Sequence, residues 1–259
     1  MKLMKSLIKK IINTDLVINL RNNLNIKPIN FNINNKKCIS ISDAFAWRTD
    51  NNFVTKFKYL DILNFFFKVK NSWIELHFYS KNNELLKIEK KKELNISNEI
   101  LIDKQFLNNT EDYGTFYIYH FTNDSINEEN IISNRCYLGY SQNQNLFSFV
   151  HGNTYAKFNK ISKDSRIYSN IVQTSLFTNN NYKIQKYFDD YDKNELYFSN
   201  PTEKVIKFSI DNKLYKLNKH CSIILDVSSK KIINIKSNCL FLRPTIFSYK
   251  NNYLDVHHG

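Results

Sequence analysis

The chain has 259 residues, of which 42% are hydrophobic, so it is long enough to bury one large core or two smaller ones. Its formal net charge of +13 comes mostly from lysines scattered singly along the chain, a pattern that does not favour a nucleic-acid partner. The four cysteines lie far apart without a CxxC pair, so neither a zinc knuckle nor a disulfide framework is expected.

The N-terminal segment, residues 1–36, is expected to form an amphipathic helix followed by an Asn-rich connector. Apolar residues such as Leu3, Leu7 and Ile11 recur at helical spacing, with lysines mostly between them. No apolar stretch is long enough for a signal peptide or a membrane span, so a cytoplasmic location is expected. A basic amphipathic helix can lie on an anionic membrane, but this one lacks Trp and Phe anchors, which favours packing against its own domain.

After residue 36 the hydrophobic period changes from 3.6 to 2. Many short alternating segments separated by polar turns, without βαβ alternation, are typical of all-β sandwiches and barrels. Asn82-Asn83 and Asp211-Asn212 supply turn chemistry for two hairpins, and only 59–69 has the pattern of a short helix. The alternating segments are 72–80, 84–90, 113–121, 182–188, 195–199, 204–210, 213–217, 222–227, 231–236 and 239–249.

The predicted fold is all-β, with two tandem antiparallel β-sandwich domains preceded by the N-terminal helix. We expect the first sandwich at 37–157 and the second at 182–259. The stretch 158–181 is polar, weakly periodic and rich in Asn, so it is interpreted as a linker or a long crossover. A single large barrel or jelly roll is the alternative architecture.

Composition makes some residues more informative than others. The chain is rich in Lys, Asn, Ile, Phe and Tyr, as strong AT pressure on the codons would produce, and Gly, Ala, Pro, Arg and Trp together number only 17. Eleven of these 17 fall in the stretches 44–48, 135–156 and 243–259, where an even distribution would place about three. These three stretches therefore supply the candidate functional residues.

The first stretch places Arg48 between acidic residues and next to Trp47. A planar guanidinium can bind a carboxylate, a phosphate or a ring face in a way that a lysine cannot. Asp43 and Arg48 are therefore candidate ligand-binding residues. The alternative interpretation is an internal ion pair between Arg48 and Asp43 or Asp50 beside a core tryptophan.

The second stretch, 134–158, has the pattern of a hairpin with its turn at 141–145. Gly152 follows His151 directly, and a glycine within a strand often marks a bulge or a close approach. Such a bulge could aim the imidazole of His151 out of the sheet, although a buried structural histidine is the alternative. The candidate residues of this stretch are Arg135, Tyr137, His151 and Asn153.

The third stretch ends in a predicted short strand with Asp255 and His257 on one face and His258 on the other. His257 with His151 and a carboxylate could form a two-His-one-carboxylate metal set. The spacing contains no HxH or HExxH motif, so no metal and no cofactor is predicted. The candidate ligand-binding residues of this stretch are Arg243, Asp255 and His258.

No nucleophile elbow, P-loop, dinucleotide fingerprint, deaminase or zincin motif is present. The leading hypothesis is a β-sandwich protein that binds a small polar or anionic ligand, such as a sugar or sugar-nucleotide, through tyrosine, asparagine and arginine side chains. One alternative is an enzyme in which His151 or His257 acts as general base or metal ligand while Arg135 or Arg243 stabilises negative charge. A non-specific nucleic-acid binder is the second alternative. The sequence does not indicate the oligomeric state.

We expect candidate side chains of the second and third stretches to lie close together in the folded protein. The prediction is that His151 lies near His257 or His258, together with Arg135 or Arg243, at one rim or domain junction.

Overall fold

The computed structural model describes residues 38–126, 131–133, 136–143, 145–153, 155–161, 168–175, 179–185, 190–227, 232–240 and 242–259, with a few isolated positions before residue 25. The predicted N-terminal amphipathic helix and its connector lie almost wholly outside these residues, and nothing in the structure supports that helix. Within the described residues, no helix has both the length and the apolar character needed to cross a membrane.

The all-β prediction is confirmed. In the described part of the chain, strands form five four-stranded sheets, and a short helix, α3 (Ile62–Phe67), falls within the predicted segment 59–69. The pairing is antiparallel throughout these sheets except between β1 and β8. The strands are β1 (Ile39–Asp43), β2 (Phe45–Arg48), β3 (Phe53–Leu60), β4 (Ser72–Ser80), β5 (Leu85–Lys91), β6 (Ser97–Ile102), β7 (Tyr113–Thr122), β8 (Ile131–Ser133), β9 (Tyr137–Gln142), β10 (Ser148–His151), β11 (Tyr155–Lys160), β12 (Tyr168–Asn170), β13 (Asn180–Gln185), β14 (Lys193–Ser199), β15 (Ile206–Ile210), β16 (Lys213–Leu217), β17 (Ser222–Val227), β18 (Ile232–Ser237), β19 (Thr245–Lys250) and β20 (Tyr253–His258).

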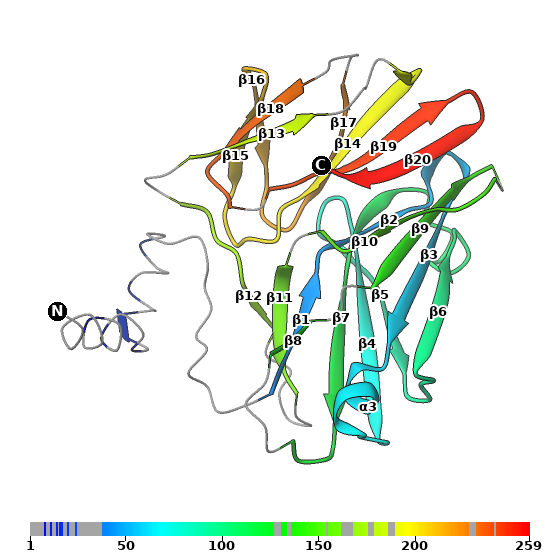
Figure 1. Ribbon diagram of the computed structural model, residues 1–259, viewed down its shortest axis with the longest axis vertical. Coiled ribbons are helices and arrows are strands. Elements are labelled where there is room, and N and C mark those ends of the chain that lie inside the picture. The colour runs from blue at the N-terminus through cyan, green and yellow to red at the C-terminus, as the bar shows by residue number, and fades with distance from the viewer. Residues whose placement is uncertain are drawn as a thin grey trace.

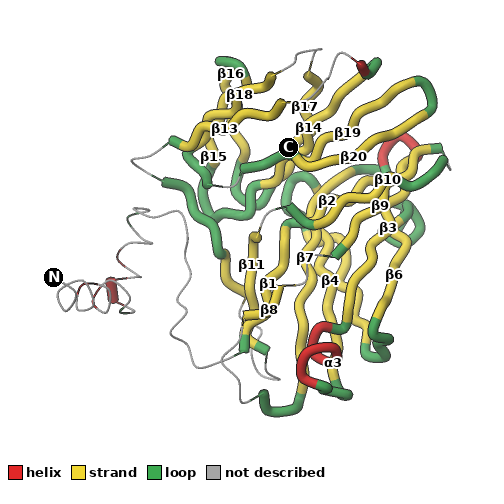
Figure 2. Tube along the Cα trace, in the orientation of Figure 1, coloured by secondary structure: helices red, strands yellow, loops and turns green. Residues whose placement is uncertain are grey.

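Strands β1 to β12 build three of the sheets, in the orders β12-β11-β1-β8, β2-β7-β4-β5 and β10-β9-β3-β6. The other two sheets, β13-β18-β15-β16 and β17-β14-β19-β20, contain only strands after residue 179. Figure 1 shows this second group gathered in the upper part of the molecule, with the first group below it. Figure 2 shows the strands joined by loops and turns, with α3 at the lower end.

The predicted hairpins are confirmed. β4 pairs with β5 across a turn in which Asn83 has a φ of 68°, and β15 pairs with β16 across Asp211 and Asn212, whose φ values are 44° and 75°. Asn and Asp tolerate this left-handed conformation better than other non-glycine residues, which explains why they occupy these turns. β9 pairs with β10, as expected for the second stretch.

The two groups of sheets share buried side chains. Phe45, Phe57 and Phe116 of the first group pack in one core cluster with Phe247 and Val256 from β19 and β20. A second cluster lies mainly between the two C-terminal sheets and also includes Ile41 of β1. The division into two sandwich domains, 37–157 and 182–259, stays a prediction.

Candidate functional site

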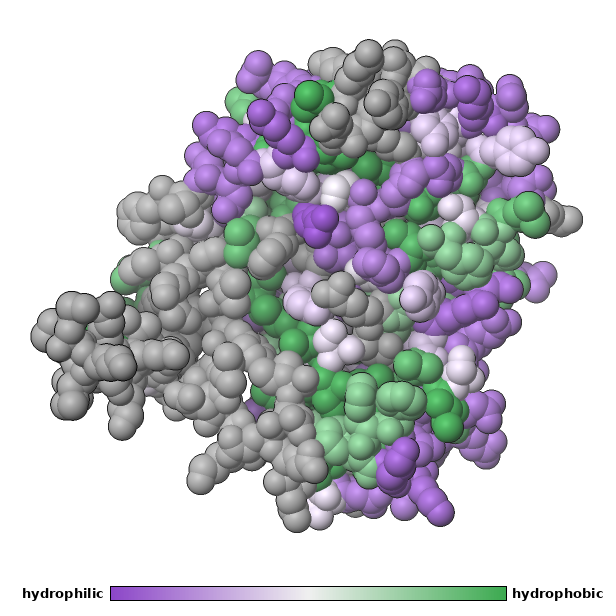
Figure 3. Space-filling view, in the orientation of Figure 1, coloured by the Kyte–Doolittle hydropathy of each residue, from purple (hydrophilic) through white to green (hydrophobic). Residues whose placement is uncertain are grey.

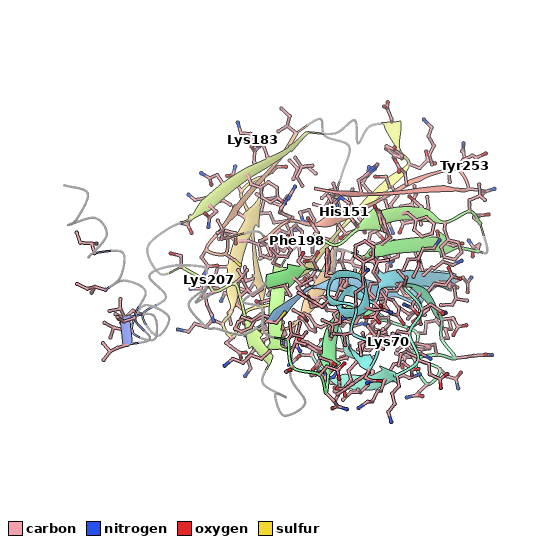
Figure 4. The ribbon with its side chains drawn as sticks, turned by 60° about the horizontal axis from the view of Figure 1, so that its bottom comes forward. Lys70, His151, Lys183, Phe198, Lys207 and Tyr253 are labelled. Carbon is pink, nitrogen blue, oxygen red and sulfur yellow. The ribbon has the colours of Figure 1, made fainter. Side chains whose placement is uncertain are left out.

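The C-terminal strand β20 lies beside β10, and each strand contributes a histidine to the contact. The Val256 backbone N–H donates to Ser148 Oγ over 2.9 Å, which holds the two strands together near their ends. His258 Nε2 then lies 2.8 Å from His151 Nδ1, with the ring centroids 4.3 Å apart. Figure 4 shows His151 close to the red C-terminal strands. The predicted meeting of His151 with one of the tail histidines is therefore confirmed.

Nδ1 of His151 has a second neighbour besides His258. It lies 3.1 Å from the carbonyl oxygen of Gly152, which can only accept a hydrogen bond. A proton on His151 Nδ1 would therefore satisfy both Gly152 O and the lone pair of His258 Nε2. In a neutral imidazole the other nitrogen is then an acceptor. His151 is exposed, so its Nε2 can accept a proton or a hydrogen bond from a ligand.

Gly152 is required because the chain passes very close to Asp43 at this point. A Cβ atom at position 152 would clash with the Asp43 carboxylate and the Phe45 ring. The next residue, Asn153, donates from Nδ2 to the carbonyl oxygens of Arg243 and Pro244, each over 3.1 Å. The β9–β10 register is regular up to His151, so the predicted bulge is not present in that pairing, and the contacts of Asn153 tie the end of β10 to the segment before β19.

Arg243 extends the site toward the C-terminal sheets. Its Nε and Nη2 donate to the Gly259 carbonyl oxygen over 3.2 and 3.1 Å, so the guanidinium is held at the residue that follows His258 in the chain. Tyr182 of β13 lies beside it. Burial raises the pKa of Tyr182, and the Arg243 guanidinium works against that rise. The phenol is therefore neutral and can donate to a ligand oxygen.

A groove of about 470 Å³ opens beside Arg243, between β13, β18 and the segment that leads to β19. The Nδ2 atom of Asn180 is buried there, and no residue of the described chain accepts from it. Buried amide donors are normally satisfied, so such an atom favours an acceptor supplied from outside the protein. The residues that define the groove include Asn180, Tyr182, Cys239, Leu242, Arg243 and Gly259.

Two other predicted residues lie on different surfaces of the same region. Tyr137 is 58% exposed and stands opposite His151 in the β9–β10 register, so it flanks the imidazole on the open face of its sheet. Asp255 accepts from the Tyr191 hydroxyl over 2.7 Å and pairs with His257 over 3.0 Å. Because side chains alternate along a strand, His257 faces away from His151.

The proposed two-His-one-carboxylate set is therefore not assembled from His257 and His151. The described residues contain no group of three or more His, Cys, Asp or Glu side chains that could hold a metal ion. Arg135 lies outside the described residues.

Arg48 lies in the interior rather than at the site. It is 1% exposed and binds Asp50 over 2.7 Å and Glu195 over 2.6 Å. Its guanidinium carbon lies 4.1 Å from the centroid of the Phe53 ring. Burial would raise the pKa of Glu195, but Arg48, Lys193 and Tyr249 together hold it below its usual value. The pair with Asp50 that the sequence suggested is present, together with a partner 147 residues away.

The structure also reveals a polar cluster that sequence reasoning missed. His220 pairs with Glu203 over 3.0 Å, and Asn170 donates to the same carboxylate. Lys157 of β11 lies over the Tyr117 ring at 4.7 Å, and burial lowers the pKa of this lysine. Lys and Asn are abundant in this chain, so only the histidine could have been singled out by rarity.

The structure thus brings together His151, Asn153, Arg243 and His258, which with Tyr182 and the adjoining groove are called the junction site below. Tyr137 flanks it, Asp43 lies against Gly152 beside it, and Arg48, Asp255 and His257 lie elsewhere. Comparison of the chain with protein-family models, with curated proteins and with solved structures found no match.

Proposed function

We propose that the protein binds a small polar ligand with a negative charge, such as a sugar phosphate or a sugar-nucleotide, at the junction site. The observation that supports this proposal is the contact between His151 and His258 at the end of the strand whose next residue, Gly259, binds Arg243 of the groove. Arginine forms strong, directional hydrogen bonds to phosphate and carboxylate oxygens. The buried Asn180 amide and the neutral Tyr182 phenol add donors of the kind that recognise hydroxyl and carbonyl oxygens.

The proposal includes an architecture and a location. The proposed architecture is two sandwich domains, at 37–157 and 182–259, with the junction site where they meet. Binding sites occur preferentially at such domain interfaces. The expected compartment is the cytoplasm, where phosphorylated sugars and sugar-nucleotides are abundant.

Titration with a graded set of probes tests the proposal. Glucose, inorganic phosphate, glucose 1-phosphate and UDP-glucose are titrated into the full chain by isothermal calorimetry. We expect the phosphorylated sugars to bind most tightly, and R243Q to weaken them about tenfold or more, since it removes charge-assisted hydrogen bonds. K250Q removes the same charge from the exposed end of β19, away from the groove, and serves as the matched control. Equal affinity of R243Q and wild type, or binding of none of the probes, would overturn the proposal.

The exposed position of His151 beside His258 supports a second candidate, an enzyme that uses the His151 imidazole as general base. In that case the wild-type chain releases phosphate or UDP from the same probes, and H151Q still binds them but does not release product. Unchanged turnover in H151Q would eliminate this candidate, and the binding proposal would stand.

A further inference from the structure

Helix α3 exposes two adjacent aromatic side chains. Ile62 and Leu63 are buried and hold the helix on the molecule, whereas Phe65 is 48% and Phe66 58% exposed. Their rings meet edge to face at 5.1 Å. Figure 3 shows a green apolar patch over α3, bordered by purple side chains. Among the described residues, the only other exposed phenylalanine is Phe149, so this pair is an exception to an otherwise buried residue type.

The exposed pair belongs to a larger apolar tip with a rigid base. Leu60 is 39% and Ile96 54% exposed, and the Asp61 N–H donates to the Ile96 carbonyl oxygen over 3.0 Å, so the two loops are joined. The Asp61 carboxylate caps α3 through the Asn64 N–H and accepts from the Ser72 hydroxyl over 2.6 Å. The apolar tip, defined as Leu60, Phe65, Phe66 and Ile96, therefore projects from a fixed turn.

A basic groove of about 380 Å³ lies beside the base of the apolar tip, since Ser72, which lines the groove, donates to the Asp61 carboxylate that caps α3. Lys70 follows α3, which ends at Phe67, while Lys90 and Lys92 belong to a run of three lysines at the end of β5 and just after it. Lys90 also pairs with Glu75 over 3.4 Å and lies 5.1 Å from the centroid of the Trp73 ring. None of the residues that line the groove is acidic. The lining includes Lys70, Asn71, Trp73, Lys90, Lys92 and Asn123.

We propose that this end of the molecule docks on the surface of an anionic lipid bilayer. The apolar tip inserts at the boundary between headgroups and acyl chains, and the basic groove takes a lipid phosphate or carboxylate. Aromatic side chains favour this boundary, and lysines are attracted to the negative surface potential beside it. The net charge of +13 adds a general attraction to an anionic surface, which does not depend on how the protein is oriented. Four apolar side chains beside a basic groove are too few for a standard protein interface, which covers about 800 Å² on each partner.

Vesicle cosedimentation tests this proposal with the full chain. Vesicles of phosphatidylcholine alone are compared with vesicles that contain phosphatidylserine. We expect binding only to the anionic vesicles, weakened by salt because the attraction is screened. F65S/F66S should reduce the partition coefficient about tenfold or more, and K70Q/K92Q should reduce it about fivefold for each lysine. Trp73 fluorescence should respond to anionic vesicles, whereas Trp47 is fully buried and serves as a constant background.

The matched controls lie on the exposed hairpin strand β16, at the opposite end of the molecule in Figure 1. K213Q/K216Q and L214S remove the same kinds of side chain there and should leave vesicle binding unchanged. Because every substituted side chain at the tip and in the groove is at least partly exposed, the melting temperature should stay close to wild type. Absence of binding to anionic vesicles would overturn the proposal. An equal loss of binding in the β16 controls would also overturn it, because the attraction would then have no defined site.

Discussion

Arg48 and Arg243 are two of only five arginines in the chain, and both lie in short stretches rich in otherwise rare residues. The structure places them in opposite environments. Arg48 is 1% exposed and fully engaged with two carboxylates and aromatic rings, whereas Arg243 is exposed and bound to a single carbonyl oxygen beside a groove. A rare residue type in a biased composition thus indicates a position where that residue is needed. It does not say whether the residue is needed for stability or for binding. Burial and the number of partners make that distinction.

The largest effect is expected from substitution of Arg48 by methionine, which keeps much of the side-chain volume but removes the charge. Glu195 is 5% exposed and would lose its principal partner. Breaking a buried ion pair from one side typically costs about 3–5 kcal/mol of unfolding free energy. Urea unfolding should show a loss of this size for R48M and no comparable loss for R243Q.

The double variant R48M/E195Q provides the control for that measurement. If the loss in R48M comes from an unpaired buried carboxylate, removing the negative charge as well should restore part of the stability. A double variant as unstable as the sum of the two single variants would show that packing against Phe53 and Phe247, rather than charge pairing, is the source.

Local pattern predicted the elements of the fold better than their arrangement. The β4–β5 and β15–β16 hairpins follow from alternation and from turn residues that accept positive φ, both of which are local properties. The pairing of β3 with both β6 and β9 depends on contacts between segments about 40 and 80 residues apart, which no local pattern encodes. The parallel pairing of β1 with β8 was not predicted for the same reason.

Prediction of the site from the sequence was limited in a similar way. The meeting of His151 with the tail was predictable because histidine, glycine and arginine are rare in this chain. The alternation of side chains along β20 predicted that His257 and His258 lie on opposite faces of the strand. It could not show which of the two faces is turned toward β10. Asn180 and Tyr182 were missed because asparagine and tyrosine are common here, so neither residue type stood out.

His120 in the interior and His151 at the junction site also lie in opposite environments. His120 is 0% exposed, neither ring nitrogen has a hydrogen-bond partner in the described part of the chain, and burial lowers its pKa to about 3. An unfolded chain protonates this histidine below about pH 6.5, whereas the folded chain does so only near pH 3. This histidine therefore costs stability as the pH falls from 6.5 to 3, by about 1.4 kcal/mol per pH unit and about 2 kcal/mol at pH 5.

H120L should remove that dependence. Unfolding free energies of wild type and H120L, measured between pH 7 and pH 4, are expected to diverge as the pH falls, with H120L the more stable at low pH. Parallel curves would mean that His120 is solvated in the folded protein, so its environment would not differ from that of His151.

The smallest effect on stability is expected at the junction histidines, and it is the most informative about function. His258 sits at the end of β20, where the pairing of Thr245 with His258 and the buried Val256 hold the strand without the imidazole. H258Q removes one hydrogen bond between partly buried His258 and exposed His151, so the unfolding free energy should change by less than about 1 kcal/mol. H257Q removes a contact with Asp255 whose two side chains are 34% and 43% exposed, so its effect on the unfolding free energy should be just as small. The two variants should therefore unfold alike but differ in binding, since H258Q frees the His151 ring and weakens the phosphorylated probes while H257Q, on the other face, does not. If H258Q instead lost as much stability as R48M, the junction histidines would be structural like Arg48, and the contrast between interior and junction would fail.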